Sequence, residues 1–427
     1  MDLAPRHRVP FPLPGLWPGS ARPLLMAGAP WLQDGATGEG LLALSLGPAL
    51  ETRWNGRGWI NRMGERECPG SPWEALAGAL PGSPGPWVGA ATFELACDEG
   101  GLPRRDLHPG ALGQHWRSLR QALHIEGGTA ELWSWEERPP DPGAWAGRFG
   151  PGGGPPSPAA VLRPRWDEAM HCAAVEAIRT RILEGGFYVA NLCTPFEGPL
   201  EGTAVDLALR VLPRARPPFG ALLDLGDRHL LSLSMERLLA RRGDRIWSQP
   251  IKGSTPLTGD PAHDRALGEA LAADPKERAE HTMIVDLVRN DLGRVARTGS
   301  VRVGPLMAVA SFPTVQHLVS TVSAEARSGL GLPDLLRAVL PGGSVTGAPK
   351  HAVCRHLASA EAGPRGFYCG ALGWIAPNGD LDLALPIRTA QIAGSGLVYW
   401  AGGGITRRSD PAREWAELHL KTRAITG

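Results

Sequence analysis

Hydrophobic and polar positions recur along this 427-residue chain with two different periods. Between residues 166 and 186, apolar residues return at helical spacing until a pair of glycines ends the pattern. Three to four residues separate neighbours on one face of an α-helix, and glycine commonly follows a helix C-terminus. The pattern therefore predicts a helix that buries Met170, Val175, Ile178 and Ile182.

Other segments show the pattern of strands and hairpins. The run "FYVANLCTPF" predicts a strand, and "GALLDLGDRHLLSLS" and "GWIAPNGDLDLAL" predict hairpins, the second turning at Asn378 and Gly379. Shorter strand-like runs, "GLLALSLG" and "PWVGAATFEL", lie nearer the N-terminus. Strands joined by hairpins are antiparallel. Together with the helices, they predict an α+β fold of layered antiparallel sheets rather than a doubly wound parallel sheet.

One stretch of the chain has neither period. Residues 137 to 164 consist almost entirely of turn formers, which predicts a linker or a long surface loop that we place at 141–160. The linker separates a Trp-, Gly- and Pro-rich supporting region, 1–140, from a catalytic region, 161–427. All candidate chemistry lies in the second region.

Composition narrows the class of protein. A chain that is 43% hydrophobic and 20% charged is globular, and a net charge of +1 gives no whole-molecule attraction to nucleic acid or anionic membranes. No stretch approaches the run of about 18 apolar residues that a membrane span needs. The six cysteines have no metal-like or CxxC spacing. We expect a cytoplasmic protein with reduced thiols and neither nucleic acid nor membrane as a partner.

Lysine is scarce in this chain. Only four lysines stand among the 44 basic residues, and one of them is Lys252 in "QPIKGSTPLTGD". Burial can lower the pKa of a lysine until the amine is neutral and nucleophilic, whereas arginine stays charged. Lys252 is therefore a candidate nucleophile or base.

Two predicted helices each carry a pair of glutamates three residues apart. Glu277 and Glu280 form the first pair, and Glu414 and Glu417 follow the predicted N-cap Asp410. Either pair alone is typical of an exposed helix face. If the pairs converge, four carboxylates would repel unless a hard cation lies between them, and Mg²⁺ suits oxygen ligands of this kind.

Two glycine-rich turns and two isolated side chains complete the candidates. "LPGGSVTGAPKHAVCRHL" leads into a helix without the Walker A spacing, and Gly402 to Gly404 allow close approach of a ligand. Arg388 lies in an apolar run, so we expect it to pair with a carboxylate of the protein or of a substrate. His317, taken alone, is more typical of a structural histidine.

These segments together resemble the chorismate-utilising enzymes, which include anthranilate synthase component I, the isochorismate and salicylate synthases, and aminodeoxychorismate synthase component I. The matching segments run in family order from about residue 165 to the end: "GGFYVANLCTPF", "LLSLSMERLL", "QPIKGSTP", "DPKERAEHTMIVDLVRNDLGRV", "VQHLVS", "PGGSVTGAPK", "RGFYCGALGW", "LPIRT" and "YWAGGGITRRSDPAREWAE". The resemblance implies an anthranilate synthase component I-like fold, a two-lobed antiparallel β sandwich with outer helices, that binds chorismate through Mg²⁺.

The resemblance also implies a role for each candidate residue. Glu280 and Glu417 would bind the metal, with Glu277 and Glu414 beside them holding metal-bound water or substrate. Glu236 in "SMER" matches the general acid that protonates the leaving 4-hydroxyl, and His317 matches an active-site histidine. The residues that match the substrate-binding set are Thr346, Gly347, Tyr368, Arg388, Gly402, Gly403, Gly404 and Lys421.

The motif around Lys252 distinguishes branches of the family. Members that make aminodeoxychorismate have P-I-K-G where anthranilate synthases have P-I-A-G. The resemblance implies that the Lys252 amine attacks C2 of chorismate as the hydroxyl leaves C4, and that ammonia then enters at C4 and expels the lysine. The isochorismate and salicylate branches use a lysine base at the position of Val189, which argues against those activities.

The source of ammonia and two departures from the family pattern leave alternative functions open. The chain has no glutaminase elbow, so we expect a separate glutamine amidotransferase subunit to supply the ammonia. Anthranilate synthase component I is the closest alternative. Val189 replaces a usual polar residue and Met235 a usual proline, and both leave open a non-catalytic chorismate-binding subunit that only regulates a partner.

Overall fold

Antiparallel strands form most of the protein. The computed structural model describes residues 3–12, 21–34, 37–150, 159–313 and 315–426. Within them, 22 strands form one continuous sheet, three more form a second, and every strand pair is antiparallel. The predicted α+β class with antiparallel sheets is confirmed.

The elements follow one another in two groups. The first group contains β1 (His7–Pro10), α1 (Arg22–Met26), β2 (Trp31–Asp34), β3 (Glu39–Trp54), β4 (Trp59–Met63), β5 (Arg66–Cys68), α2 (Pro72–Ala79), β6 (Trp87–Ala91), α3 (Phe93–Glu99), β7 (Leu112–Glu126), β8 (Thr129–Ser134) and α4 (Pro142–Ala146). The second group contains β9 (Ala159–Ala160), β10 (Arg163–Pro164), α5 (Glu168–Leu183), β11 (Val189–Glu201), α6 (Ala204–Ala215), β12 (Phe219–Asp224), β13 (His229–Ser234), β14 (Arg237–Arg242), β15 (Arg245–Gln249), β16 (Ile251–Pro256), α7 (Pro261–Ala273), α8 (Pro275–Gly293), β17 (Arg302–Val303), β18 (Ala308–Phe312), β19 (Val315–Val319), β20 (Val322–Glu325), α9 (Leu332–Val339), the 3₁₀ turn η2 (Gly343–Val345), β21 (Gly347–Ala348), α10 (Lys350–Ala360), β22 (Ala371–Ile375), β23 (Leu381–Ala384), β24 (Thr389–Ala393), β25 (Gly396–Ile405) and α11 (Pro411–Thr426).

Two long strands, β3 and β7, divide the large sheet into two lobes. They pair with each other along most of their length, with several register shifts that bend the strands. From one end, pairing continues through β2, β12, β13, β24, β25 and β11, and from the other through β6, β22, β23, β14, β15 and β20. This topology confirms the predicted two-lobed sandwich.

Strands from both sides of the predicted linker pair with each other. The β2–β12 and β6–β22 pairs join residues below 140 to residues above 160, so the supporting region completes sheets of the catalytic region. Within the predicted linker, α4 and β9 flank residues 151–158, which lie outside the described residues. The boundaries at 140 and 160 stay a prediction.

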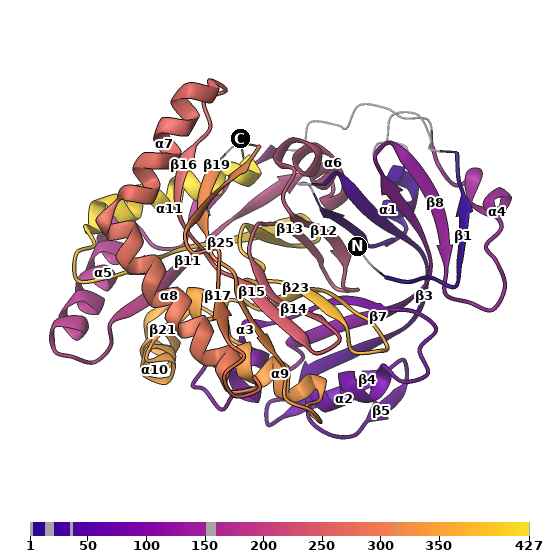
Figure 1. The fold of residues 1–427 in the computed structure, drawn as a ribbon, viewed down its shortest axis with the longest axis horizontal. Coiled ribbons are helices and arrows are strands. Elements are labelled where there is room, and N and C mark those ends of the chain that lie inside the picture. Colours follow the sequence, from indigo (N-terminus) through magenta and orange to yellow (C-terminus); the bar gives the residue numbers. More distant parts are fainter. Residues whose placement is uncertain (1–2, 13–20, 35–36, 151–158, 314, 427) are drawn as a thin grey trace.

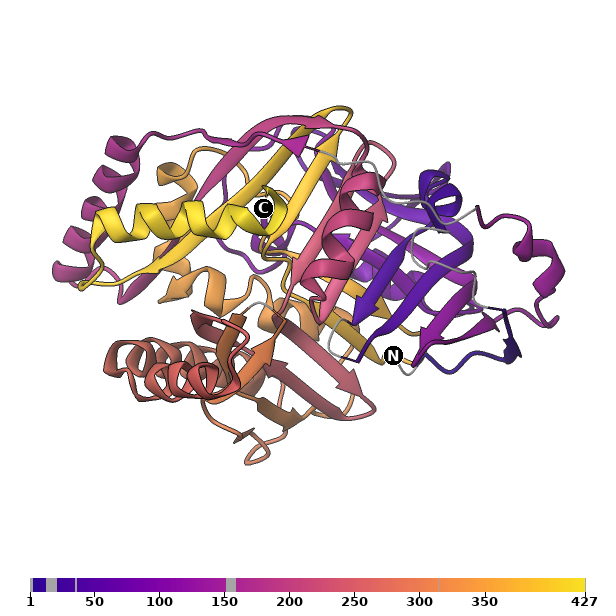
Figure 2. The same ribbon diagram turned by 90° about the horizontal axis from the view of Figure 1, so that it is seen from above.

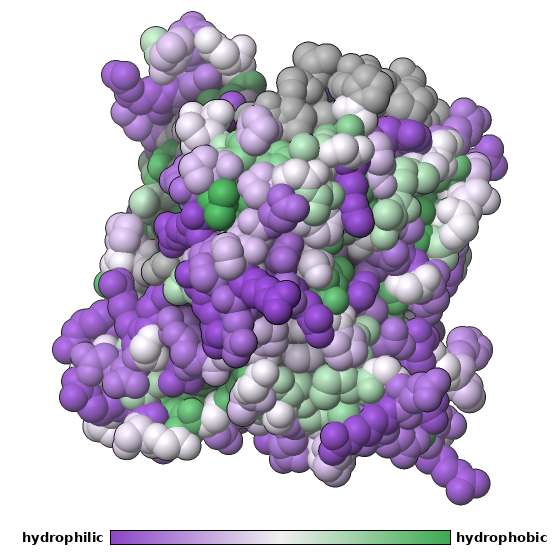
Figure 3. Space-filling view, turned by 90° about the vertical axis from the view of Figure 1, so that its right-hand side faces the viewer, coloured by the Kyte–Doolittle hydropathy of each residue, from purple (hydrophilic) through white to green (hydrophobic). Residues whose placement is uncertain are grey.

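The helices α5, α7, α8, α10 and α11 gather on the side opposite β1 and β8 (Figure 1). Seen from above, α11 lies across β25, and α7 lies beside α8 (Figure 2). On the face formed by the N-terminal strands, hydrophobic residues are scattered among hydrophilic ones (Figure 3). Among the residues that the structure describes, no helix combines the length and apolar character needed to cross a bilayer.

Most predicted elements are confirmed, with two local corrections. The predicted hairpins are β12–β13 and β22–β23. The predicted helix is α5, but Met170 is 52% exposed and His171 is buried instead, so the buried face is shifted by one residue at its start. The run "PWVGAATFEL" is not all strand: β6 ends at Ala91, and α3 follows because the Thr92 hydroxyl caps it by accepting the N–H of Leu95 at 3.2 Å.

Candidate active site

A cavity of about 260 Å³ brings together residues from opposite ends of the catalytic region. The predicted residues that line it are Glu236, Lys252, Glu277, Glu280, His317, Tyr368, Arg388, Gly402, Gly403, Gly404, Glu414, Glu417 and Lys421. They come from β16, α8, β19, β25, α11 and the loops around them. The cavity is therefore the candidate active site.

Helix caps fix the position of both glutamate pairs. Asp274 caps α8 by accepting the N–H groups of Lys276 and Glu277, and Asp410 accepts the N–H of Arg413 at 2.9 Å where α11 begins. Each cap is followed within one or two turns by its E-x-x-E pair, and both pairs reach the same cavity. Both glutamate pairs therefore lie in the wall of one cavity, and their predicted role as metal ligands stays a prediction.

Three of these carboxyl groups are partly or fully buried. Burial raises the pKa of Glu277, Glu280 and Glu414 above the usual value. Oε1 of Glu280 is buried without a hydrogen-bond partner, and its nearest cation, Nζ of Lys276, lies 3.9 Å away. A bound cation at this place would satisfy these oxygens.

Glu417 differs from the other three. Burial alone would raise its pKa, but the ammonium of Lys421, 2.6 Å from Oε1, outweighs burial and holds the pKa below the usual value. Lys421 also donates to the carbonyl oxygen of Gly402 at 2.7 Å. The lysine thus ties α11 to β25. Gly402, Gly403 and Gly404 lie within this strand and pair with β11, so the turn predicted for them is wrong.

The all-oxygen character of the two pairs suits Mg²⁺. As placed, no three His, Cys, Asp or Glu side chains among the described residues converge on one metal position. The unpartnered oxygen of Glu280 and the raised pKa values nevertheless fit the binding of a cation. A Mg²⁺ ion remains a proposal.

Glu236 has the properties of a proton donor. It lies between β13 and β14, is 5% exposed, and accepts a 2.6 Å hydrogen bond from the Ser344 hydroxyl at Oε1. Burial raises its pKa to about 7, although the Ser344 hydrogen bond and the charge of Lys252 oppose that rise. A carboxyl group with such a pKa still carries its proton in a large fraction of molecules near neutral pH.

Lys252 extends from β16 against the backbone of β25. A Cβ added to Gly404 would lie 3.1 Å from the Lys252 Nζ and 3.8 Å from Cγ2 of Val189. Glycine at position 404 therefore leaves room for the amine. The charge of Lys252 also lowers the pKa of Glu236 and Glu280, so the amine lies within electrostatic reach of both.

His317 is held as a neutral imidazole. Nδ1 lies 2.6 Å from the carbonyl oxygen of Gly253, and since a carbonyl can only accept, Nδ1 carries the hydrogen. Nε2 lies 3.0 Å from the Met235 sulfur. Burial lowers the pKa of His317 to about 4, so the ring is uncharged at neutral pH.

Arg388 and Tyr368 are two of the predicted substrate-binding side chains in the cavity lining. Nη1 of Arg388 is 3.4 Å from the backbone oxygen of Lys421, and within the described ranges no carboxylate lies within 4.0 Å of its guanidinium. A substrate carboxylate can therefore be its partner. The ring of Tyr368 stacks on Trp400 with centroids 6.3 Å apart and planes 15° apart.

Two predicted substrate-binding residues lie outside the cavity lining. The Thr346 hydroxyl is buried and donates to the carbonyl oxygen of Gly342 at 2.9 Å. Gly347 pairs with Ala190 of β11, where an added Cβ would lie 2.1 Å from the carbonyl oxygen of Val189. In the structure both residues shape the turn around η2, and their role in binding a substrate stays a prediction.

Several lining residues were not predicted. These are Asn191, Ile251, Gly253, Ser254, Lys276, Ser344, Val345, Ile387, Trp400 and Ala401. Most lie within the motifs that carry the resemblance, directly beside a predicted residue. Asn191 could have been predicted from the sequence, because it is a polar residue inside the apolar strand "FYVANL" and such a residue needs a polar partner.

Comparison with known proteins identifies the family. Residues 77–427 match the model of the chorismate binding enzymes, and the chain belongs to this family. Aminodeoxychorismate synthase component 1 of Klebsiella aerogenes is 43% identical over 249 residues, covering 58% of this chain and 55% of that protein. Anthranilate synthase component 1 of Streptomyces coelicolor is 39% identical over 259 residues, covering 60% of this chain and 51% of that protein.

A solved structure supports the same fold. Anthranilate synthase component I from Streptococcus pneumoniae TIGR4 superposes with a TM-score of 0.77 at 25% identity, covering 91% of this chain and 92% of that one. This match confirms the predicted anthranilate synthase component I-like fold. The chain matches about half the length of these curated relatives, and the relatives carry two different names. The exact reaction of this chain is therefore a proposal.

Proposed function

We propose that this chain is component I of an aminodeoxychorismate synthase, which converts chorismate and ammonia to 4-amino-4-deoxychorismate for para-aminobenzoate and folate synthesis. The observation that carries the proposal is the position of Lys252, whose side chain lines the same cavity as Glu236 and the two glutamate pairs. A nucleophile, an acid and an anion site within one cavity are what a substitution on a dicarboxylate requires.

Each residue has a part in the proposed reaction. The amine of Lys252, in its neutral form, uses its lone pair to form a bond to C2 of chorismate, and the ring double bonds shift. The C4–O bond breaks while Glu236 gives its proton to the departing hydroxyl, which leaves as water. Ammonia then bonds to C4 and releases the lysine. Arg388 is available to hold a substrate carboxylate. Mg²⁺ near Glu280 and Glu417 would supply positive charge for another carboxylate.

Anthranilate synthase component I is the second candidate. Relatives of that name are nearly as similar to this chain as the aminodeoxychorismate synthases are. Both reactions use chorismate and ammonia and place the new nitrogen on different carbons. Lys252 favours the first candidate because it offers an amine to C2, the carbon that anthranilate synthesis must leave free for ammonia.

The ammonia is expected from a separate subunit. We propose a glutamine amidotransferase partner, a suggestion supported by the "component 1" in the names of the curated relatives. The chain alone should use ammonium salts but release no glutamate from glutamine. Glutamate release by the purified chain would contradict this part of the proposal.

The test of function is product identity. The purified chain is incubated with chorismate, Mg²⁺ and ammonium at mildly alkaline pH, and the product is identified by mass spectrometry. Lys252→Ala should reduce turnover by at least about 100-fold, the lower end of what a positioned catalytic group contributes. Lys252→Arg is the matched variant, since it keeps the charge without a neutral amine and should lose as much.

Each outcome separates the candidates. Aminodeoxychorismate from the parent chain and its loss in both variants would support the proposal. Anthranilate as the product would assign the chain to the second candidate. Absence of any turnover would favour a chorismate-binding subunit without catalysis.

A further inference from the structure

The hydroxyl of Ser344 holds one oxygen of the Glu236 carboxyl group. The two atoms, Oγ and Oε1, are 2.6 Å apart, and both side chains are buried. We propose that Ser344 is a positioning residue that fixes Oε1, so that the acid proton of Glu236 resides on Oε2 and points to the substrate. This inference rests on the proposed role of Glu236 as the general acid.

The turn that carries Ser344 is closely packed. The serine lies in η2, where the Thr346 hydroxyl closes the turn onto Gly342 at 2.9 Å. The turn packs closely against α8, because a Cβ on Gly343 would lie 2.7 Å from the side chain of Leu287. A donor fixed by its backbone in this way restricts the rotation of the carboxyl group that it contacts.

The direction of the hydrogen bond decides which carboxyl oxygen of Glu236 carries the transferable proton. Since the Ser344 hydroxyl donates to Oε1, that oxygen acts as an acceptor, and no hydrogen bond to Oε2 occurs among the described residues. The acid proton is therefore free to reside on Oε2 and to be given up there.

Proton transfer strengthens the same contact. As the Oε2–H bond breaks, a new O–H bond forms on the departing hydroxyl, and the electron pair of the C4–O bond goes to that oxygen, which leaves as water. The negative charge stays on the Glu236 carboxylate. A hydrogen bond to an ionised oxygen is stronger than one to a neutral oxygen, so Ser344 stabilises the product of the transfer.

The other titratable or charged side chains near Glu236 do not donate a hydrogen bond to its carboxyl group. Lys252 acts on the carboxyl group through its charge, not through a hydrogen bond. His317 is neutral and contacts the sulfur of Met235. Arg237, the next residue in the chain, is turned to Asp382, with Nε and Oδ1 2.9 Å apart. Ser344 is thus the hydrogen-bond donor available to orient the acid.

The kinetic test compares Ser344→Ala with Ser344→Thr. Chorismate consumption is followed against pH, because the rate falls at alkaline pH as the general acid loses its proton. Ser344→Ala removes a contact that stabilises the carboxylate, so kcat should fall about ten- to a hundred-fold while the alkaline limb moves to higher pH. Ser344→Thr keeps the hydroxyl and should restore both the rate and the limb.

A second measurement does not depend on turnover. The infrared band of the protonated Glu236 carboxyl, assigned as the band lost in Glu236→Gln, is titrated in the parent and in Ser344→Ala. The titration should move to higher pH in the variant. Ser344→Cys, a similar volume with a weak donor, should behave like Ser344→Ala and keeps the test available if alanine destabilises the turn.

Ser359→Ala is the control, because this exposed serine of α10 donates to the backbone oxygen of His356 and does not line the cavity. It should change neither the rate nor the titration. An unchanged alkaline limb together with an unchanged infrared titration in Ser344→Ala would overturn the inference. Anthranilate as the parent's product would refute the proposed function alone, since chorismate consumption still reports on Ser344.

Discussion

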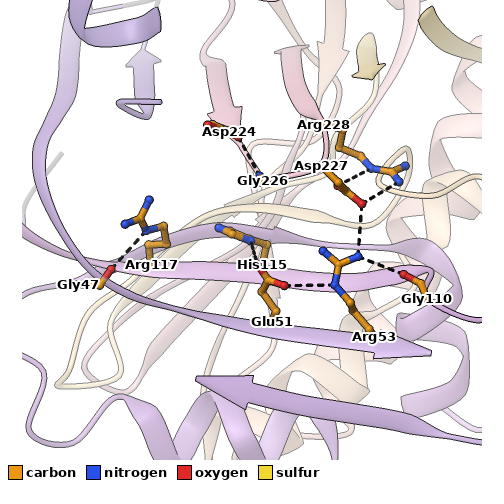
Figure 4. A network of polar contacts seen from close by, with 10 residues as sticks. All are labelled: Gly47, Glu51, Arg53, Gly110, His115, Arg117, Asp224, Gly226, Asp227 and Arg228. Carbon is orange, nitrogen blue, oxygen red and sulfur yellow. Dashed lines mark hydrogen bonds and ion pairs between the residues drawn. The ribbon is translucent and has the colours of Figure 1, made fainter. Parts of the chain in front are cut away.

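In two groups of charged residues in this protein, the pKa values of carboxyl groups shift in opposite directions. One is the cavity, where burial raises the pKa of Glu277, Glu280 and Glu414. The other is a polar network that joins β3 and β7 to the β12–β13 turn (Figure 4), and its members are Gly47, Glu51, Arg53, Gly110, His115, Arg117, Asp224, Gly226, Asp227 and Arg228. There, contacts lower the pKa of both Glu51 and Asp227.

The two groups differ in the partners of their carboxylates and in exposure, since Glu51 and Asp227 are 31% and 36% exposed while Glu280 is 14% exposed. In the network, Arg53 lies 3.2 Å from Glu51 and 3.3 Å from Asp227, and Arg228 lies 3.0 Å from Asp227. In the cavity, Oε1 of Glu280 has no hydrogen-bond partner. A buried carboxylate without partners costs stability, so a fold retains several of them together mainly where a ligand completes them. The network therefore fits a structural role, and the cavity fits the binding of a charged ligand.

The largest expected effect is the loss of kcat on replacing Glu236, the proposed general acid in the cavity. Glu236→Gln keeps an oxygen that can accept the Ser344 hydrogen bond but removes the transferable proton. We expect kcat to fall by about 10²–10⁴-fold, the usual contribution of a general acid. Steady-state rates of chorismate consumption, with circular dichroism to confirm folding, measure the effect.

Glu94 provides a matched control for Glu236. Burial raises the pKa of Glu94 to about 7 as well, but its oxygens accept the N–H groups of Arg365 and Gly366, and it does not line the cavity. Glu94→Gln should lower stability by about 1–3 kcal/mol, because one N–H loses its acceptor, with kcat nearly unchanged. Equal kcat losses in both variants would show that burial, not position, explains the result for Glu236.

The next largest effect is a loss of stability on replacing Arg365, a buried and fully paired arginine beside the cavity. Arg365 is 1% exposed, lies 2.6 Å from Glu361, and donates to the backbone oxygens of Asn191 and Val345. Arg365→Met should lower the free energy of unfolding by about 3–5 kcal/mol, since it leaves Glu361 buried and unpaired. Urea unfolding measures this, and the double variant with Glu361→Gln should recover part of the loss. A loss that the double variant does not reduce would contradict the pairing argument.

The sequence predicted the elements and chemical types of the site well. Periodicity and turn residues sufficed for α5, for both hairpins and for the start of α11 at Asp410, because these are local features. The convergence of the glutamate pairs followed from the resemblance rather than from spacing, since α8 and α11 are more than a hundred residues apart.

Contacts set by tertiary packing could not be predicted. Thr346 and Ser344 are two residues apart in one motif, yet the first closes the turn and the second reaches Glu236. Only the packing of η2 against α8 decides which side chain faces the cavity. Met170 was misplaced for a similar reason, because the orientation of α5 is set by its neighbours and buries His171 instead.

The smallest expected effect lies in the polar network. The contact with His115, 3.3 Å from Oε1, holds the pKa of Glu51 below the usual value, so Glu51 contributes stability above its unfolded pKa of about 4.3 and loses it as the pH falls further. Because Glu51 and Arg53 are partly exposed, Glu51→Gln should cost only about 1 kcal/mol at pH 7. Urea unfolding at pH 7 and pH 3 measures the difference.

The pH dependence of the stability of Glu51→Gln tests the comparison between the polar network and the cavity. If Glu51 acts through charge, the difference between parent and Glu51→Gln should shrink at pH 3 and at high salt, and kcat should stay unchanged at pH 7. A difference that persists at pH 3 would mean that the network stabilises the fold by packing. The contrast between paired and unpaired charge would then rest on the cavity alone.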